Sequence, residues 1–344
     1  MDTSLVEKIA DAVLYEGYML YPYRASSVKN RQRFNWGALA PKAYSDAQKG
    51  TEAWEMKTEC LISGDRNTEL RVKVRFLQLT NREIGKVTEA HEFEMVQSLD
   101  IDGKLYQAWQ EAVERDVVLP ILNPGKPNIE FPFSFPESSE TEDIFNAAGD
   151  HVGAIIRNQR EITGEVNVKI DTNAGNGLSK ITVLIRNTTP FADAELSDRE
   201  GALLSSIVST HTILGVEGGE FVSLIDPSEQ YSEAAAACEN KGTYPVLAGP
   251  EGQRGFMLSS PIILYDYPEI ADESAGELFD GTEIDEILTL RIMTLTDEEK
   301  REMRFVDDRA RKILERTEAM PEEQLLKMHG AVRGLNKSKK ASYG

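Results

Sequence analysis

The feature that most constrains the fold is a pair of alternating apolar and polar runs joined by a turn-forming segment. Residues 164–170 and 178–186 each alternate branched apolar side chains with polar ones. The connecting residues 171–177 are rich in Asp, Asn and Gly, which favour tight turns. Because alternation with period two places every second side chain on one face of a strand, the sequence predicts an antiparallel hairpin here.

A second hairpin is expected nearer the start of the chain. Residues 54–62 and 70–76 alternate in the same way, and the bridge at 63–68 contains Gly, Asp and Asn. The polar face of the first run carries glutamates and that of the second carries cations. Cross-strand ion pairs of roughly 0.2–1 kcal/mol each are therefore expected between the two runs.

Other segments are predicted from their periodicity and from their Pro, Gly and capping residues. Helices are expected at residues 3–16, 199–211, 233–240, 282–293 and 296–318 and from Pro321, with a capping box at Thr296-Asp-Glu-Glu299. Strands are expected at 92–96, 220–225 and 261–265. Prolines recur between residues 119 and 136, and each removes a backbone donor. That stretch is therefore predicted to be an edge strand or a surface crossover.

These elements predict an α+β protein with a mostly antiparallel, sandwich-like β body and a helical C-terminal segment. The polar run at 137–143 is interpreted as a boundary. The predicted regions are 1–140 (α+β, with antiparallel hairpins), 141–280 (β-rich), 281–333 (C-terminal helices) and 334–344 (a flexible basic tail).

Composition narrows the classes of function. A formal net charge of −20 argues against nucleic-acid binding and against anionic membrane surfaces, since both need a cationic field. No apolar run approaches the roughly 20 residues that span a bilayer. The first twenty residues lack the pattern of a secretory signal, and two distant cysteines, Cys60 and Cys238, form no metal-binding pair. The expected location is cytoplasmic, with reduced thiols.

A cationic, aromatic segment stands out against this acidity. Its candidate partner- or anion-binding residues are Tyr21, Tyr23, Arg24, Lys29, Asn30, Arg31, Arg33 and Trp36. Arginine forks match carboxylates and phosphates, so the segment fits a protein partner or a small-anion pocket. It also fits internal salt bridges combined with aromatic packing, and these three readings stay open.

A second candidate is acidic. Residues 266–286 contain nine carboxylates and neither Lys nor Arg. The proposed docking residues are Asp266, Glu269, Asp280, Glu283, Asp285 and Glu286. The segment lacks the ligand spacing of an EF-hand, so a solvated face or a dock for a basic partner is favoured over a metal site.

The sequence predicts no catalytic residue, metal or cofactor. The four histidines are scattered, and no Gly-x-Ser-x-Gly elbow surrounds a serine. Cys238 lies in an alanine-rich, helical-looking stretch, where it is interpreted as a small buried hydrophobe.

Several strings together carry a family resemblance. They are YPYRASSVKNRQRF at 21–34, GGEFVSLIDP at 218–227, GTYPVLAG at 242–249, and SSPIILYDYPEI at 259–270 continuing into LFDGTEIDEILTL at 278–290. The chain thereby resembles a family of uncharacterised bacterial accessory proteins encoded beside uptake nickel–iron hydrogenases. The resemblance implies an accessory or assembly role around a large metalloenzyme and carries over no site residues.

The leading functional hypothesis is a non-catalytic accessory protein that binds another protein, such as a hydrogenase subunit or maturation factor. The first alternative is an enzyme or a binder of a small anionic ligand, using Arg24, Lys29, Arg31 and Arg33. The second is a structural subunit of a homo-oligomer whose edge strands pair between copies.

Overall fold

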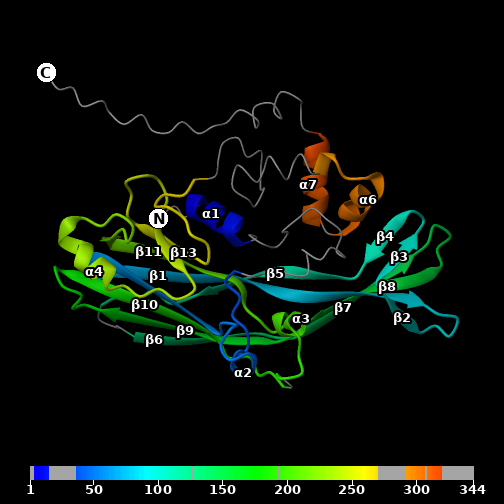
Figure 1. The fold of residues 1–344 in the computed structure, drawn as a ribbon, viewed down its shortest axis with the longest axis horizontal. Coiled ribbons are helices and arrows are strands. Elements are labelled where there is room, and N and C mark those ends of the chain that lie inside the picture. Colours follow the sequence, from blue (N-terminus) through cyan, green and yellow to red (C-terminus); the bar gives the residue numbers. More distant parts are fainter. Residues whose placement is uncertain are drawn as a thin grey trace.

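A single strand of 33 residues, β1 (Glu55–Val87), runs along most of the sheet in the computed structural model (Figure 1). The structure describes residues 4–14, 36–124, 128–192, 194–269, 292–306 and 308–319. Within these residues the protein is mostly antiparallel β, as the alternating patterns predict.

Both edges of β1 are occupied along its length. On one edge lie β10 (Leu178–Asn187), β5 (Trp109–Val118) and β2 (Phe93–Val96), in that order along β1. On the other edge lie β11 (Val208–Phe221) and then β8 (His151–Gln159). β1 therefore pairs with all five of these strands and links them into one sheet.

The outer strands extend these two regions. β9 (Ile162–Asp171) and then β6 (Asn128–Phe135) follow β10, while β13 (Phe256–Ser260) and β12 (Tyr244–Ala248) follow β11. β7 (Ser138–Phe145) pairs with β8 at the far end. A small separate sheet consists of β3 (Ser98–Ile101) and β4 (Lys104–Gln107).

The helices of the described residues are short. They are α1 (Ser4–Leu14), α2 (Lys42–Ala47), α3 (Arg199–Leu203), the 3-10 turn η2 (Glu229–Tyr231), α4 (Ser232–Ala236), α6 (Asp297–Val306) and α7 (Asp308–Glu318). None of the helices that the structure describes is long and apolar enough to cross a membrane.

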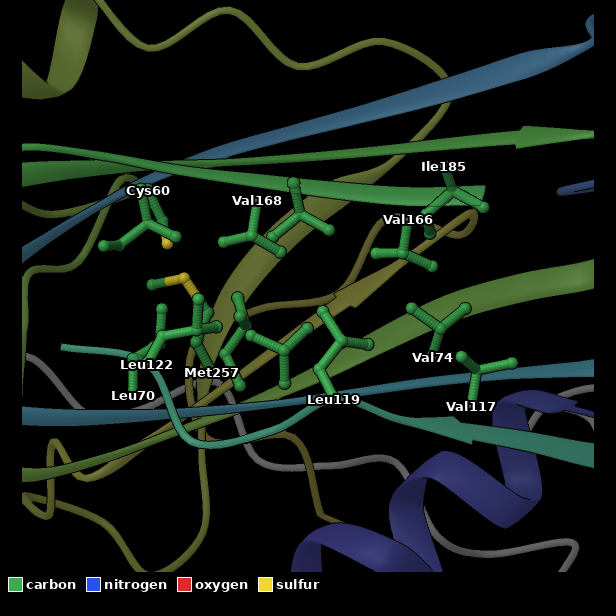
Figure 2. Close-up of a cluster of buried hydrophobic side chains, with 14 of the residues drawn as sticks. Cys60, Leu70, Val74, Val117, Leu119, Leu122, Val166, Val168, Ile185 and Met257 are labelled. Atoms are coloured by element: carbon green, nitrogen blue, oxygen red, sulfur yellow. The ribbon is translucent and has the colours of Figure 1, made fainter. Parts of the chain in front are cut away.

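The sheet curls so that two of its parts face each other across an apolar core. Val166, Val168 and Ile185 of β9 and β10 lie opposite Val74 of β1 and Val117 of β5, as Figure 2 shows. Each such Val, Leu or Ile side chain contributes about 1.5–3 kcal/mol when fully buried. The core is therefore the dominant source of stability in this part of the sheet.

The outer face of the sheet is covered at one end by α1. Val6, Ile9, Ala10 and Val13 follow helical spacing and pack against a cluster that includes Leu258 of β13. The amphipathic pattern that predicts this helix therefore also selects the face it buries. Figure 1 shows α1 lying across β11 and β13.

The hairpin at 164–186 is confirmed. β9 and β10 pair antiparallel, with Ile170 opposite Ile181 and Val166 opposite Ile185. The proline-rich stretch also behaves as predicted, because β6 contains Pro132 and pairs only with β9 at the sheet edge. The helix at 3–16 and the strand at 92–96 are confirmed as α1 and β2.

The predicted hairpin between residues 54–62 and 70–76 is wrong. Both runs belong to β1: the first pairs with β10 and reaches β11 at Ile62, and the second pairs with β11. Residues 65–68 bulge out opposite Gly218. The bulge closes on itself, because Thr68 Oγ1 accepts from Asp65 N at 2.9 Å and donates to Gly218 O at 3.0 Å. Gly, Asp and Asn residues often reverse the chain in a hairpin turn. Here they form a bulge, and the strand continues in the same direction beyond it.

Other predictions fail for similar reasons of context. Of the expected helix at 199–211, only α3 forms, and β11 begins at Val208. Residues 261–265 form no strand.

Of the polar run at 137–143, residues 138–143 lie in β7. The 11-stranded sheet contains strands from both sides of residue 140.

Near the C-terminus, the capping box forms as predicted. Thr296 N donates to Glu299 Oε2 at 2.9 Å, and Glu299 N donates to Thr296 Oγ1 at 3.2 Å. One uninterrupted helix to Glu318 is wrong, since Lys300 and Arg304 both reach Glu318. In a single helix those residues would be about 21–27 Å apart along the axis, so the chain reverses between α6 and α7.

Candidate functional site

Most of the predicted cationic segment lies outside the described residues. This applies to Tyr21, Tyr23, Arg24, Lys29, Asn30, Arg31 and Arg33. Trp36 is described, and its side chain is 39% exposed. The structure therefore leaves the grouping of these residues a prediction.

The acidic segment is described only at its start. Asp280, Glu283, Asp285 and Glu286 lie outside the described residues. Asp266 is half-buried and accepts hydrogen bonds from Leu247 N at 2.8 Å and from Ser223 Oγ at 2.5 Å. Both of its oxygens therefore anchor the chain to β12 and to the end of β11, whereas Glu269 is exposed.

Three described side chains that could act as a base or a nucleophile, those of His211, Cys60 and Cys238, are wholly or partly withdrawn from solvent. His211 is fully buried, and its Nδ1–H donates to Ser209 O at 3.1 Å. Burial lowers the pKa of His211 to about 4. Burial likewise raises the pKa of the Cys60 thiol, and that of Cys238 to about 11. All three side chains are therefore neutral near pH 7.

Cys238 packs as a small hydrophobe, as its surroundings in the sequence suggest. It lies against the cluster of Leu61, Leu178, Val222 and Ala235. Among the residues that the structure describes, no three His, Cys, Asp or Glu side chains converge as metal ligands would.

Arg75 ties α1 to the sheet. Its guanidinium contacts Asp11 of α1 at 2.5 Å, Asp116 at 2.9 Å and Glu114 at 3.2 Å. Burial opposes the charged form, but the carboxylates of Asp11 and Asp116 outweigh it and raise the pKa of Arg75. The arrangement is a fully compensated ion cluster beneath a helix.

Arg115 lies on the opposite, concave face of the same pair of strands. Its Nε donates to Gln78 Oε1 at 2.7 Å, and its Nη2 donates to Gln159 Oε1 at 2.8 Å. The guanidinium also lies 4.9 Å from the centre of the Phe135 ring. Burial lowers the pKa of Arg115. Here a half-buried cation is held by neutral groups.

The far end of the sheet carries an exposed aromatic surface, which we call the distal patch: Phe93, Met95, Phe145 and His151. The ring centre of His151 is 6.0 Å from that of Phe93 and 5.5 Å from that of Phe145. Met95 and Phe145 are 54% and 56% exposed. The patch therefore presents large apolar side chains to solvent.

Local backbone geometry explains how the patch forms. Gly85 of β1 lies beneath Phe93, and a Cβ there would be 2.9 Å from the ring. The absence of a side chain at Gly85 leaves room for the Phe93 ring. His151 Nε2 is 3.2 Å from Asp143 Oδ1, which orients the imidazole beside Phe145.

Neither the distal patch nor Arg115 was predicted from the sequence. The patch residues come from three strands, and only the alternation of Phe93 and Met95 at 92–96 gives a local signal. Arg115 sits in an ordinary charged run, Glu-Arg-Asp. Its lack of a carboxylate partner depends on strand register.

Comparison with known proteins identifies no relative: no family model, no curated protein and no solved structure matches the chain.

Proposed function

We propose that this protein acts by binding another protein and catalyses no reaction itself. The partner would be a subunit or maturation factor of a nickel–iron hydrogenase in the cytoplasm, as the family resemblance implies. The observation that carries the proposal is the distal patch, in which the exposed rings of Phe93 and Phe145 flank His151 and the exposed Met95 lies two residues from Phe93 on β2.

The chemistry of the distal patch suits an interface. Aromatic and methionine side chains are enriched in the cores of protein interfaces, and a few such anchors supply most of the binding energy. The patch lies at the end of β1, so a continuous strand connects it to the buried core. We further infer that the curled sheet behaves as a sandwich-like body that holds this surface in place.

The surroundings of the patch favour a protein over a small ligand. β2 and β7 are edge strands, each paired on one side only in the described sheet. An extended segment of a partner can add to such an edge through main-chain hydrogen bonds. The neutral state of the buried His211 and Cys60 and of the half-buried Cys238 supports a role that does not use these three side chains as an acid, base or nucleophile.

The test is a pulldown with purified hydrogenase subunits and maturation factors. Wild-type protein should recover a partner, and a Phe93→Glu/Phe145→Glu double variant should not, because it places charge in the centre of the apolar surface. Val118→Glu is the matched control: Val118 is 63% exposed but pairs with Lys73, far along β1 from Val87, the partner of Phe93.

Equal recovery by all three proteins, or recovery by none, would refute binding through the patch. Loss only in an Arg24/Arg31/Arg33 charge-reversed variant would assign docking to the cationic segment instead. Measurement of mass in solution separates a homo-oligomer from these outcomes.

A further inference from the structure

Arg115 is held rigidly by two buried amides. Gln78 is fully buried and its Nε2 donates to Arg160 O at 2.8 Å, while Gln159 Nε2 donates to Thr80 Oγ1 at 3.0 Å. These outer hydrogen bonds point both amide oxygens toward the guanidinium. Rotation of Arg115 would break both bonds, so its orientation is set before any ligand arrives.

The positive charge of Arg115 has no carboxylate partner among the residues that the structure describes. Glu111, four residues earlier in β5, is engaged by Arg82 at 2.8 Å and by Arg157 at 2.9 Å. Arg157 is also paired with Glu142. Arg82 and Arg157 thus share Glu111 and Glu142, and Arg115 takes part in none of these ion pairs.

The unused donors of Arg115 define how an anion can approach. A guanidinium has five N–H donors, and the two amides use two of them. The remaining donors are on Nη1 and Nη2, a pair whose spacing matches the two oxygens of a carboxylate. Phe135 covers one face of the guanidinium, so the anion must approach in its plane.

We propose that Arg115 is the recognition site for a small organic carboxylate that bears one negative charge and an apolar body. A single uncompensated cation balances one charge, and a dianionic phosphate would add repulsion in a chain of net charge −20. The apolar part would lie against Val113, which is 39% exposed two residues from Arg115 on the same face of β5.

The experiment follows the Nε–H resonance of Arg115 by NMR in the full chain, with sodium benzoate, sodium acetate, inorganic phosphate and sodium chloride as probes. Arg115→Lys assigns the resonance. Val113→Glu supplies an internal carboxylate at an exposed position and so tests the site without removing the arginine. Arg71→Gln, at an exposed and already paired arginine, is the control for lost charge.

Benzoate should shift the Arg115 resonance saturably, with acetate weaker and chloride without a saturable effect. Val113→Glu should weaken benzoate binding by about tenfold or more, whereas Arg71→Gln should leave it unchanged. The proposal is overturned if benzoate gives no saturable shift, if Val113→Glu leaves the shift intact, or if phosphate binds more tightly than benzoate.

Discussion

The two faces of the β1–β5 strand pair surround an arginine with opposite kinds of partner. Arg75 and Arg115 are close neighbours in this ladder, since Arg75 pairs with Asp116 and Phe76 pairs with Arg115. Under α1, Arg75 contacts three carboxylates, whereas on the concave face Arg115 contacts two neutral amides.

The difference shows how a guanidinium's role depends on its partners. A buried charge must be paired or hydrogen-bonded to be tolerated. Carboxylates neutralise the charge of Arg75, and its ion pair with Asp11 holds α1 on the sheet. The two amides accept hydrogen bonds from Arg115 but do not neutralise its charge. Three measurements test this contrast.

The largest effect is expected at Arg75. Arg75→Met removes the guanidinium that Asp11, Asp116 and Glu114 share, and with it the ion pair between Asp11 of α1 and the sheet. The free energy of unfolding, measured by urea denaturation, should fall by about 3 kcal/mol. Arg71→Met, at an arginine that is 50% exposed, should cost less than about 1 kcal/mol. Equal losses in the two variants would contradict a clamp at Arg75.

The next effect concerns His211, which pairs with Arg75 across β1 and β11. Its pKa is lowered to about 4 in the folded protein, mainly by burial and also by Arg75. The unfolded chain therefore binds the extra proton below about pH 6.5, so stability is complete above that pH and is lost as the pH falls toward 4.

Between pH 7 and pH 5 this loss should be about 2 kcal/mol from His211 alone. Urea denaturation of wild type and of His211→Gln at both pH values isolates the contribution, because acidic groups titrate in both proteins. An unchanged pH dependence in His211→Gln would show that the imidazole does not carry the effect.

The smallest effect is expected at Arg115. Arg115→Met keeps the contact with Phe135 but leaves the oxygens of Gln78 and Gln159 without their donor. Since removal of the uncompensated charge offsets part of that cost, the free energy of unfolding should fall by only about 1 kcal/mol. A loss as large as that of Arg75→Met would make Arg115 a structural clamp too.

The parts of the fold that could be predicted are those in which the pairing strands lie close together in the sequence. The hairpin of β9 and β10 is encoded locally, because both strands and their turn lie within 26 residues. The sequence predicts a hairpin within β1, because residues 63–68 have the composition of a hairpin turn. The strand continues instead, because the bulge there is accommodated by Gly218 and Gly219 of β11, far away in the sequence.

Elsewhere, strand residues that are buried on both faces do not show the alternation of apolar and polar side chains. At the start of β11, Ile207 and Leu214 face the core, while Val208 and Ile213 face α1 and its surroundings. A run that is buried on both sides does not alternate, so it resembles a helix in sequence. The candidate sites are harder still, since the register of β1 with β5 and β8 decides which side chains surround Arg115.

The length of β1 has a consequence for the order of folding. The first half of β1 has no strand to pair with until β10 and β11 have been synthesised, and those strands end at residues 187 and 221. During synthesis, the growing chain therefore leaves this amphipathic segment without its partner strands while more than a hundred further residues emerge. Such distant pairings slow folding and expose strand edges to other chains. Early release from the ribosome, before β11 is complete, is expected to send this protein toward aggregation.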